Sequence, residues 1–266
     1  AERVPGITLP GMVNLHCHSF QRALAGLAQR RDGNGDDFWS WRETMYRFLE
    51  RIGPDELYAI TAQLYIELLK GGYTAVCEFH YLHNDPAGRA YDDPALLSAV
   101  IHEAAGATGI GLTLLPSLYM TGGFGHRPPE AAQRRFLTTP ERYLALIERL
   151  DGVFKDQADR RLGLAPHSLR AVPVEVLGEV VTARRRADPF APVHLHLAEQ
   201  EREVADCLAW SGARPASLLL DRLEIDRQWC LVHATHLDDA EIVGVARSGA
   251  VAGLCPTTEA DLGDGL

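Results

Sequence analysis

Short apolar segments that suit β-strands alternate with longer helical patterns along most of this 266-residue chain. Seven segments have the length and apolar character of buried strands, and they cover residues 12–16, 73–79, 109–115, 162–165, 193–197, 229–233 and 250–254. Strands joined through helices lie parallel, because each crossover helix returns the chain to the same end of the sheet. Seven such units favour a TIM-like (β/α)8 barrel lacking one strand over an open doubly wound sheet. We therefore predict one α/β domain over residues 1–266.

The segments between the predicted strands carry recognisable helix boundaries. One helix is expected to begin at Pro54 and end at Gly71, and another to begin at Pro140 and end before residues 151–152. Two long connections, residues 19–53 and 117–138, interrupt this pattern and contain aromatic residues and glycines. Long loops after barrel strands either cover an active site or pack as ordinary surface loops, and the sequence leaves both interpretations open.

The composition is ordinary for a globular protein, with 46% hydrophobic and 23% charged residues. No apolar run approaches the roughly 18 residues that a membrane span needs, and the first residues lack the features of a signal peptide. A formal net charge of -10 without any basic cluster disfavours a nucleic-acid partner. We expect a cytoplasmic enzyme whose five scattered cysteines are reduced thiols.

Histidines stand at the ends of three predicted strands. His16 and His18 are two residues apart at the end of the first strand, so their imidazoles leave it on one face. His196 and His233 end two later strands. The carboxyl ends of barrel strands meet around one site, and three imidazoles there can bind one Zn²⁺ and leave a position for water. We predict His16, His18 and His196 as metal ligands, although a lone histidine is more often a hydrogen-bonded core residue.

Glu199 and His233 are the predicted catalytic side chains. Glu199 follows His196 by three residues, so its carboxylate would reach water at the metal without binding the metal itself. This is the position of a proton shuttle for hydrolytic deamination, whereas Glu199 alone would suit the first turn of a helix. His233 would face the same centre and polarise the carbon under attack or stabilise the oxyanion that forms.

Longer motifs around these residues are similar to those of one family. They are PGMVNLHCH at residues 10–18, EFHYLH at 78–83, APHSLR at 165–170, HLAEQ at 196–200 and CPTTEA at 255–260. With these motifs the chain resembles the amidohydrolase superfamily and, within it, the formimidoylglutamate deiminases of histidine breakdown. The His-x-His and His-x-x-Glu elements are shared by many deaminases of the superfamily, whereas the segments around Tyr81, Phe124 and Arg170 are more specific.

This resemblance implies a mononuclear zinc deiminase, with iron as an alternative metal. The family's ligands fall on His16, His18 and His196, its acid/base on Glu199 and its transition-state histidine on His233. Its substrate contacts fall on Gln21, Tyr81, His167 and Arg170, with Arg42 a weaker match that would otherwise be a surface charge on a helix. The expected partner is a small dicarboxylate amidine, which an acidic protein would hold through placed arginines. We expect no nucleic-acid or membrane partner, and a homodimer as the assembly to test.

The chain also departs from the family pattern. The family's fourth metal ligand is an aspartate at the end of barrel strand eight, and this chain ends before such a strand. Asp261 and Asp264, which we expect in a loop after the seventh strand, do not match that ligand. The family's small β domain has no counterpart either. The expectation is an apparently truncated barrel that carries most of a catalytic site.

The predicted function is zinc-dependent hydrolytic deimination of N-formimino-L-glutamate to N-formyl-L-glutamate and ammonia. One alternative is another deaminase of the superfamily, acting on guanine, cytosine or an adenosine derivative. A purine site has no use for arginines directed at carboxylates, so substrate choice separates the two. The other alternative is a non-catalytic metal-binding module, from which ammonia release would distinguish an enzyme.

Overall fold

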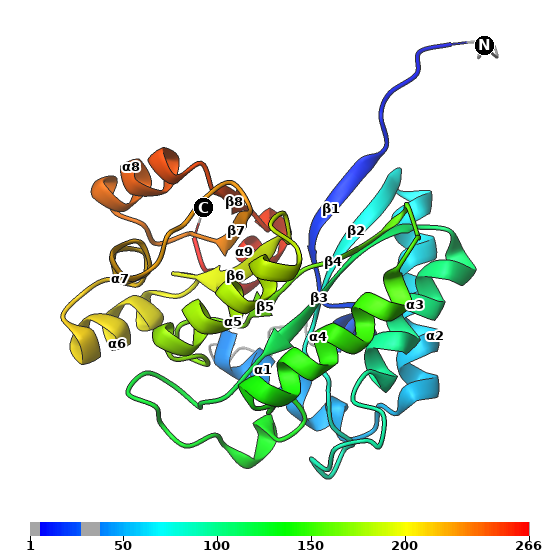
Figure 1. Cartoon of the computed structure of the whole chain (residues 1–266), viewed down its shortest axis with the longest axis horizontal. Coiled ribbons are helices and arrows are strands. Elements are labelled where there is room, and N and C mark those ends of the chain that lie inside the picture. The colour runs from blue at the N-terminus through cyan, green and yellow to red at the C-terminus, as the bar shows by residue number, and fades with distance from the viewer. Residues whose placement is uncertain (1–5, 28–37, 266) are drawn as a thin grey trace.

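The computed structural model describes residues 6–27 and 38–265. These residues form a curved sheet of parallel strands with helices on its outside (Figure 1). The strands are β1 (Met12–Cys17), β2 (Tyr73–His80), β3 (Gly111–Leu118), β4 (Arg160–Leu162), β5 (Ala165–Pro166), β6 (Val193–Leu197), β7 (Trp229–His233) and β8 (Val251–Gly253). Both β4 and β5 pair with β3, so they are two pieces of the fourth barrel strand. β8 is consequently the seventh barrel strand, and all seven predicted strands are confirmed.

The strands follow the order expected of consecutive β/α units. β1, β2, β3 and β4 are neighbours in that order, β6, β7 and β8 form a second run, and every pair is parallel. Parallel bridges from Leu164 to Val193 and from Ser168 to His196 join the two runs. Within the described residues β1 pairs only with β2 and β8 only with β7, which makes the barrel open at this seam.

Helices alternate with the strands, and α2, α3 and α4 lie along the outer side of β1 to β4 (Figure 1). The helices are α1 (Phe38–Leu49), α2 (Pro54–Lys70), α3 (Leu96–Thr108), α4 (Pro140–Phe154), α5 (Val174–Ala187), α6 (Glu201–Ser211), α7 (Pro215–Arg222), α8 (Asp239–Ser248) and α9 (Pro256–Leu262). In α4 the buried residues Tyr143, Ile147 and Leu150 form one apolar stripe against the sheet. Among the described residues, none of the helices has the length and apolar character needed to cross a membrane.

Several strand ends are shifted by one to three residues from the prediction, and three features outside the strands also differ from it. The connection 19–53 contains the 3-10 helix η1 (Ser19–Leu24) and α1, because Trp41, Met45 and Phe48 repeat at helical spacing and face the core. α4 continues through residue 152 to Phe154, whose buried ring contributes a last apolar turn. Asp261 lies within α9 instead of a loop. The side chains of residues 38–40, two aromatic residues and a serine, lie outside the described part of the structure.

Candidate active site

One cavity of about 100 Å³ lies at the carboxyl ends of the strands. Its lining includes all ten residues that the sequence singled out, namely His16, His18, Gln21, Arg42, Tyr81, His167, Arg170, His196, Glu199 and His233. Arg42 contributes from α1, so it is a lining residue and not a surface charge facing away from the site. The fold therefore brings together residues from five separate strand ends, as the barrel prediction requires.

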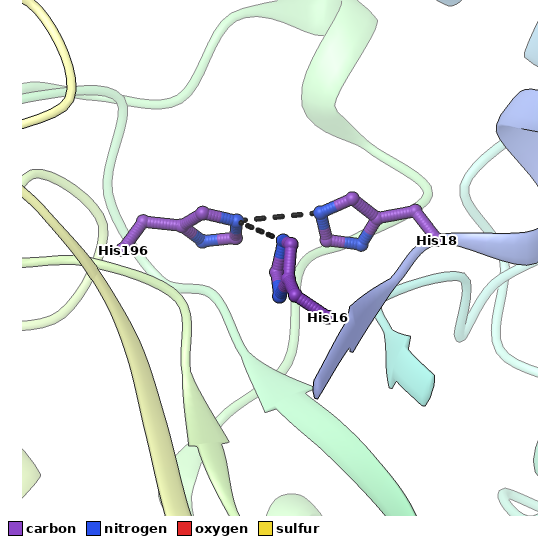
Figure 2. A group of neighbouring side chains, drawn as sticks. All are labelled: His16, His18 and His196. Atoms are coloured by element: carbon purple, nitrogen blue, oxygen red, sulfur yellow. Dashed lines mark hydrogen bonds between the residues drawn. The ribbon is translucent and has the colours of Figure 1, made fainter. Parts of the chain in front are cut away.

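The three predicted metal ligands point their ring nitrogens at one another (Figure 2). His196 Nε2 lies 3.1 Å from His16 Nε2 and 3.3 Å from His18 Nε2. His16 and His18 come from the end of β1, where the chain is extended, and His196 comes from β6. The set forms a group of nitrogens within 4.8 Å of one another that could hold a metal ion.

Hydrogen bonds on the far side of two rings fix which nitrogen faces the centre. His18 Nδ1 lies 2.8 Å from the carbonyl oxygen of Phe79, and His196 Nδ1 lies 3.0 Å from that of His167. Because a carbonyl only accepts, each Nδ1 carries the proton and each neutral Nε2 presents a lone pair. Two lone pairs 3.3 Å apart repel unless a cation lies between them, so the donor set fits a divalent metal.

Burial keeps the three rings neutral, which metal ligation requires. Desolvation lowers the pKa of His18 to about 4 and lowers the pKa values of His16 and His196 well below the usual value. His16 also lies near His233 and Cys255 in a second group of potential ligands. Burial raises the pKa of the Cys255 thiol to about 12, so the three neutral imidazoles are the better metal site.

Glu199 and His233 face each other across the next part of the cavity. Glu199 Oε1 lies 3.5 Å from His233 Nε2, and both side chains are buried. Glu199 sits in the turn before α6, not in its first helical turn, because Ala198 adopts a left-handed conformation with φ 49°. His233 and Ala234 are also left-handed, with φ 68° and 53°. Such conformations are costly for residues other than glycine and occur often at functional sites.

Beside Glu199 the lining of the cavity is cationic and aromatic. The Arg170 guanidinium lies 3.6 Å from both Glu199 Oε2 and Glu203 Oε2, between two buried carboxylates. Arg42 Nε donates to the Tyr46 hydroxyl at 2.6 Å. Gln21 donates to the Tyr81 hydroxyl at 2.9 Å. These contacts hold the polar side chains in place in the lining of the cavity.

Three buried glutamates support the site and were not predicted from the sequence. Glu203 accepts hydrogen bonds from the amides of Ala198 and Glu199 at 3.3 and 3.2 Å. Glu259 lies 3.2 Å from His233 Nδ1, and Glu78 accepts from the Ser19 amide at 2.7 Å. Glu78 and Glu259 occur in the motifs that carry the resemblance, but only the three-dimensional contacts give them a place. Glu203 and Glu259 each lie one contact behind a cavity residue, whereas Glu78 contacts Ser19, next to the cavity residue His18.

Comparison with known protein families identifies the family of this chain. The family model described as "Amidohydrolase family" matches residues 7–266. The chain belongs to the amidohydrolase family. Its parallel α/β fold and its histidines at strand ends agree with that membership, and the resemblance seen in the sequence is confirmed.

Individual relatives narrow the comparison. The formimidoylglutamate deiminase of Pseudomonas aeruginosa is 54% identical over 266 residues, which is 100% of this chain and 58% of that protein. A 5-methylthioadenosine/S-adenosylhomocysteine deaminase of Natronomonas pharaonis is 28% identical and matches 98% of this chain and 53% of its own length. The chain therefore spans little more than half the length of these relatives.

Solved structures agree with the fold. The crystal structure of an amidohydrolase from Brucella melitensis superposes with a TM-score of 0.91 at 49% identity, over 96% of this chain and 56% of that one. A zinc-bound adenosine deaminase from Xanthomonas campestris superposes with a TM-score of 0.72 at 24% identity, over 97% of this chain and 52% of that one. The second match supports the fold alone.

Proposed function

We propose that this chain carries the metal-dependent active site of a formimidoylglutamate deiminase, which converts N-formimino-L-glutamate and water to N-formyl-L-glutamate and ammonia. The observation that carries the proposal is one cavity holding both the three-imidazole group and the arginines Arg42 and Arg170. The 54% identity to the Pseudomonas enzyme, against 28% for the methylthioadenosine deaminase, supports the same substrate.

His16, His18 and His196 are the proposed metal ligands. A zinc ion bound there would make the attacking water more acidic, and the same donor set would accept iron. Glu199 takes a proton from the water and delivers it to the nitrogen that leaves as ammonia. Because Glu199 Oε1 lies 3.5 Å from His233 Nε2, both groups would reach a substrate bound at the same point of the cavity. His233, through the proton that its Nε2 shares with Glu199, stabilises the charge that develops as the amidine carbon becomes tetrahedral.

The glutamate end of the substrate is assigned to the part of the cavity lined by Arg42 and Arg170. Arg170 would hold one carboxylate through its planar guanidinium, and Arg42 would hold the second. Gln21, Tyr81 and His167 line the same cavity as these arginines and the three imidazoles. Neutral purines offer no carboxylate to the arginines, which disfavours the purine deaminase alternative. The expected homodimer and cytoplasmic location stay predictions.

An arginine substitution tests the assignment of the substrate. In the protein carrying this sequence, Arg170→Met should raise KM for formiminoglutamate by roughly 10-fold to 100-fold, which corresponds to loss of a charged hydrogen bond. The KM for formamidine, which has no carboxylate, should change by less than about threefold. Arg214→Met is the control, since Arg214 pairs with the buried Glu241 away from the cavity. Equal effects of Arg170→Met on both substrates would show that Arg170 has a structural role only.

A further inference from the structure

We infer that Glu259 is a positioning residue for His233, holding its ring as the tautomer protonated at Nδ1 and directing Nε2 toward Glu199. The inference deepens the proposed function, since it explains how one member of the catalytic pair is oriented. Its direct evidence is the contact chain Glu259, His233, Glu199, in which each ring nitrogen of His233 faces a carboxylate oxygen. The separations are 3.2 Å on the Nδ1 side and 3.5 Å on the Nε2 side.

The contact with Glu259 determines the position of one proton. Glu259 Oε1 lies 3.2 Å from His233 Nδ1, and both side chains are buried. An ionised carboxylate only accepts hydrogen bonds, so Nδ1 must carry a hydrogen for this contact to be favourable. The other nitrogen, Nε2, faces Glu199 Oε1 at 3.5 Å, where it can share the proton that Glu199 takes from the water. A carboxylate behind a functional histidine fixes its tautomer in this way in many enzymes.

His233 needs such an anchor because its backbone is unusual. Residues 233 and 234 both adopt left-handed conformations, and the Ala234 amide donates to the carbonyl of Leu197 at 3.0 Å. This turn directs the His233 ring toward the metal group, where it stacks on the ring of His196 with centroids 5.6 Å apart. The backbone sets the direction of the side chain, but only a contact to a ring nitrogen selects the tautomer.

Glu259 itself is held in a fixed position. It lies in the first turn of α9, and its Oε1 accepts a hydrogen bond from the Cys255 amide at 2.9 Å. Among the described residues, His233 is the ionisable side chain that forms an ion-pair contact with Glu259. Glu241, another buried helical glutamate, pairs instead with Arg214 and caps α8. Glu259 is thus placed for His233, whereas Glu241 serves the fold.

Nitrogen NMR of histidine-labelled, zinc-loaded protein tests the inference without any substrate. In the wild type, Nδ1 of His233 should give the nitrogen signal of a protonated ring nitrogen. Glu259→Met removes the acceptor at similar volume and should move this resonance wholly or partly to Nε2. Glu259→Gln keeps an oxygen acceptor and should preserve the wild-type pattern. Glu241→Met is the matched control for burying an apolar side chain in a helix, and it should leave His233 unchanged.

The kinetic consequence provides a second readout, which rests on the proposed function. Glu259→Met should lower kcat for formiminoglutamate by about 10-fold to 100-fold, with KM within about twofold. Glu259→Gln should recover most of this loss. A wild-type spectrum with the proton on Nε2 would overturn the inference even if no variant folds. An unchanged tautomer and kcat in Glu259→Met would show that Glu259 only caps α9. If formiminoglutamate is not turned over at all, the tautomer still decides the inference separately.

Discussion

The buried carboxyl of Glu78 should make the stability of this protein fall between acidic and neutral pH. Glu78 is fully buried on β2, accepts the Ser19 amide at 2.7 Å and lies 3.3 Å from the Tyr65 hydroxyl that donates to it. Burial raises its pKa from 4.5 to about 7, because these hydrogen bonds offset only part of the lost hydration. The Ser19 contact ties Glu78 to the segment that follows the metal-ligand candidate His18.

The sign and size of the effect follow from linkage. The folded state holds the Glu78 proton more tightly than the unfolded state does. Below pH 4.5 the protonated carboxyl therefore makes its full stabilising contribution to the folded state. That contribution is lost as pH rises through about 7. At about 1.4 kcal/mol per pH unit, the full change is about 3 kcal/mol, most of it between pH 5 and pH 8. Glu78→Gln cannot ionise and should not show the change.

Urea unfolding of the wild type and Glu78→Gln at pH 5 and pH 8 measures this quantity. The free energy of unfolding of the variant minus that of the wild type should be about 2 to 3 kcal/mol more positive at pH 8 than at pH 5. The buried histidines titrate in both proteins, so their contributions cancel in the difference. Glu175→Gln, on the exposed surface of α5, is the control and should show no such trend. A wild-type-to-variant difference that is constant with pH would refute the reasoning.

Two further predictions concern the site itself. His196→Ala should abolish binding of one zinc per chain measured by elemental analysis; at a free zinc concentration 100 times its Kd, zinc should stabilise the wild type by about 2.7 kcal/mol and the variant negligibly. Equal zinc content in both would remove His196 from the site. Glu199→Gln should retain zinc but lose turnover by about 10²-fold or more, since the amide cannot carry the proton; wild-type turnover in this variant would exclude Glu199 as the shuttle.

Regular spacing made the barrel and the metal group predictable. His16 and His18 share a face because strand residues alternate, and the parallel fold brings the end of β6, with His196, to the same place. The position of Glu199 followed from its distance along the chain from His196. These predictions used only the periodicity of strands and the rule that barrel sites lie at strand ends.

The supporting residues lay beyond such reasoning because they depend on irregular backbone. Glu203 reaches the amides of Ala198 and Glu199 only because Ala198 is left-handed, which no residue type there signals. Glu259 meets His233 through the short helix α9, which the sequence suggested to be a loop. Helix α1 was hidden within a long connection. A contact between side chains on two separate turns can be predicted only after the backbone conformation of both turns is known.

The most direct test of the central claim is ammonia release by the zinc-loaded protein carrying this sequence. N-formimino-L-glutamate, formamidine, adenosine and guanine should be compared at equal concentrations, with N-formyl-L-glutamate measured alongside. We predict one N-formyl-L-glutamate per ammonia and a kcat/KM for formiminoglutamate roughly 10²-fold or more above that for formamidine, as two charged contacts imply. Release of ammonia from a purine but not from formiminoglutamate would contradict the account.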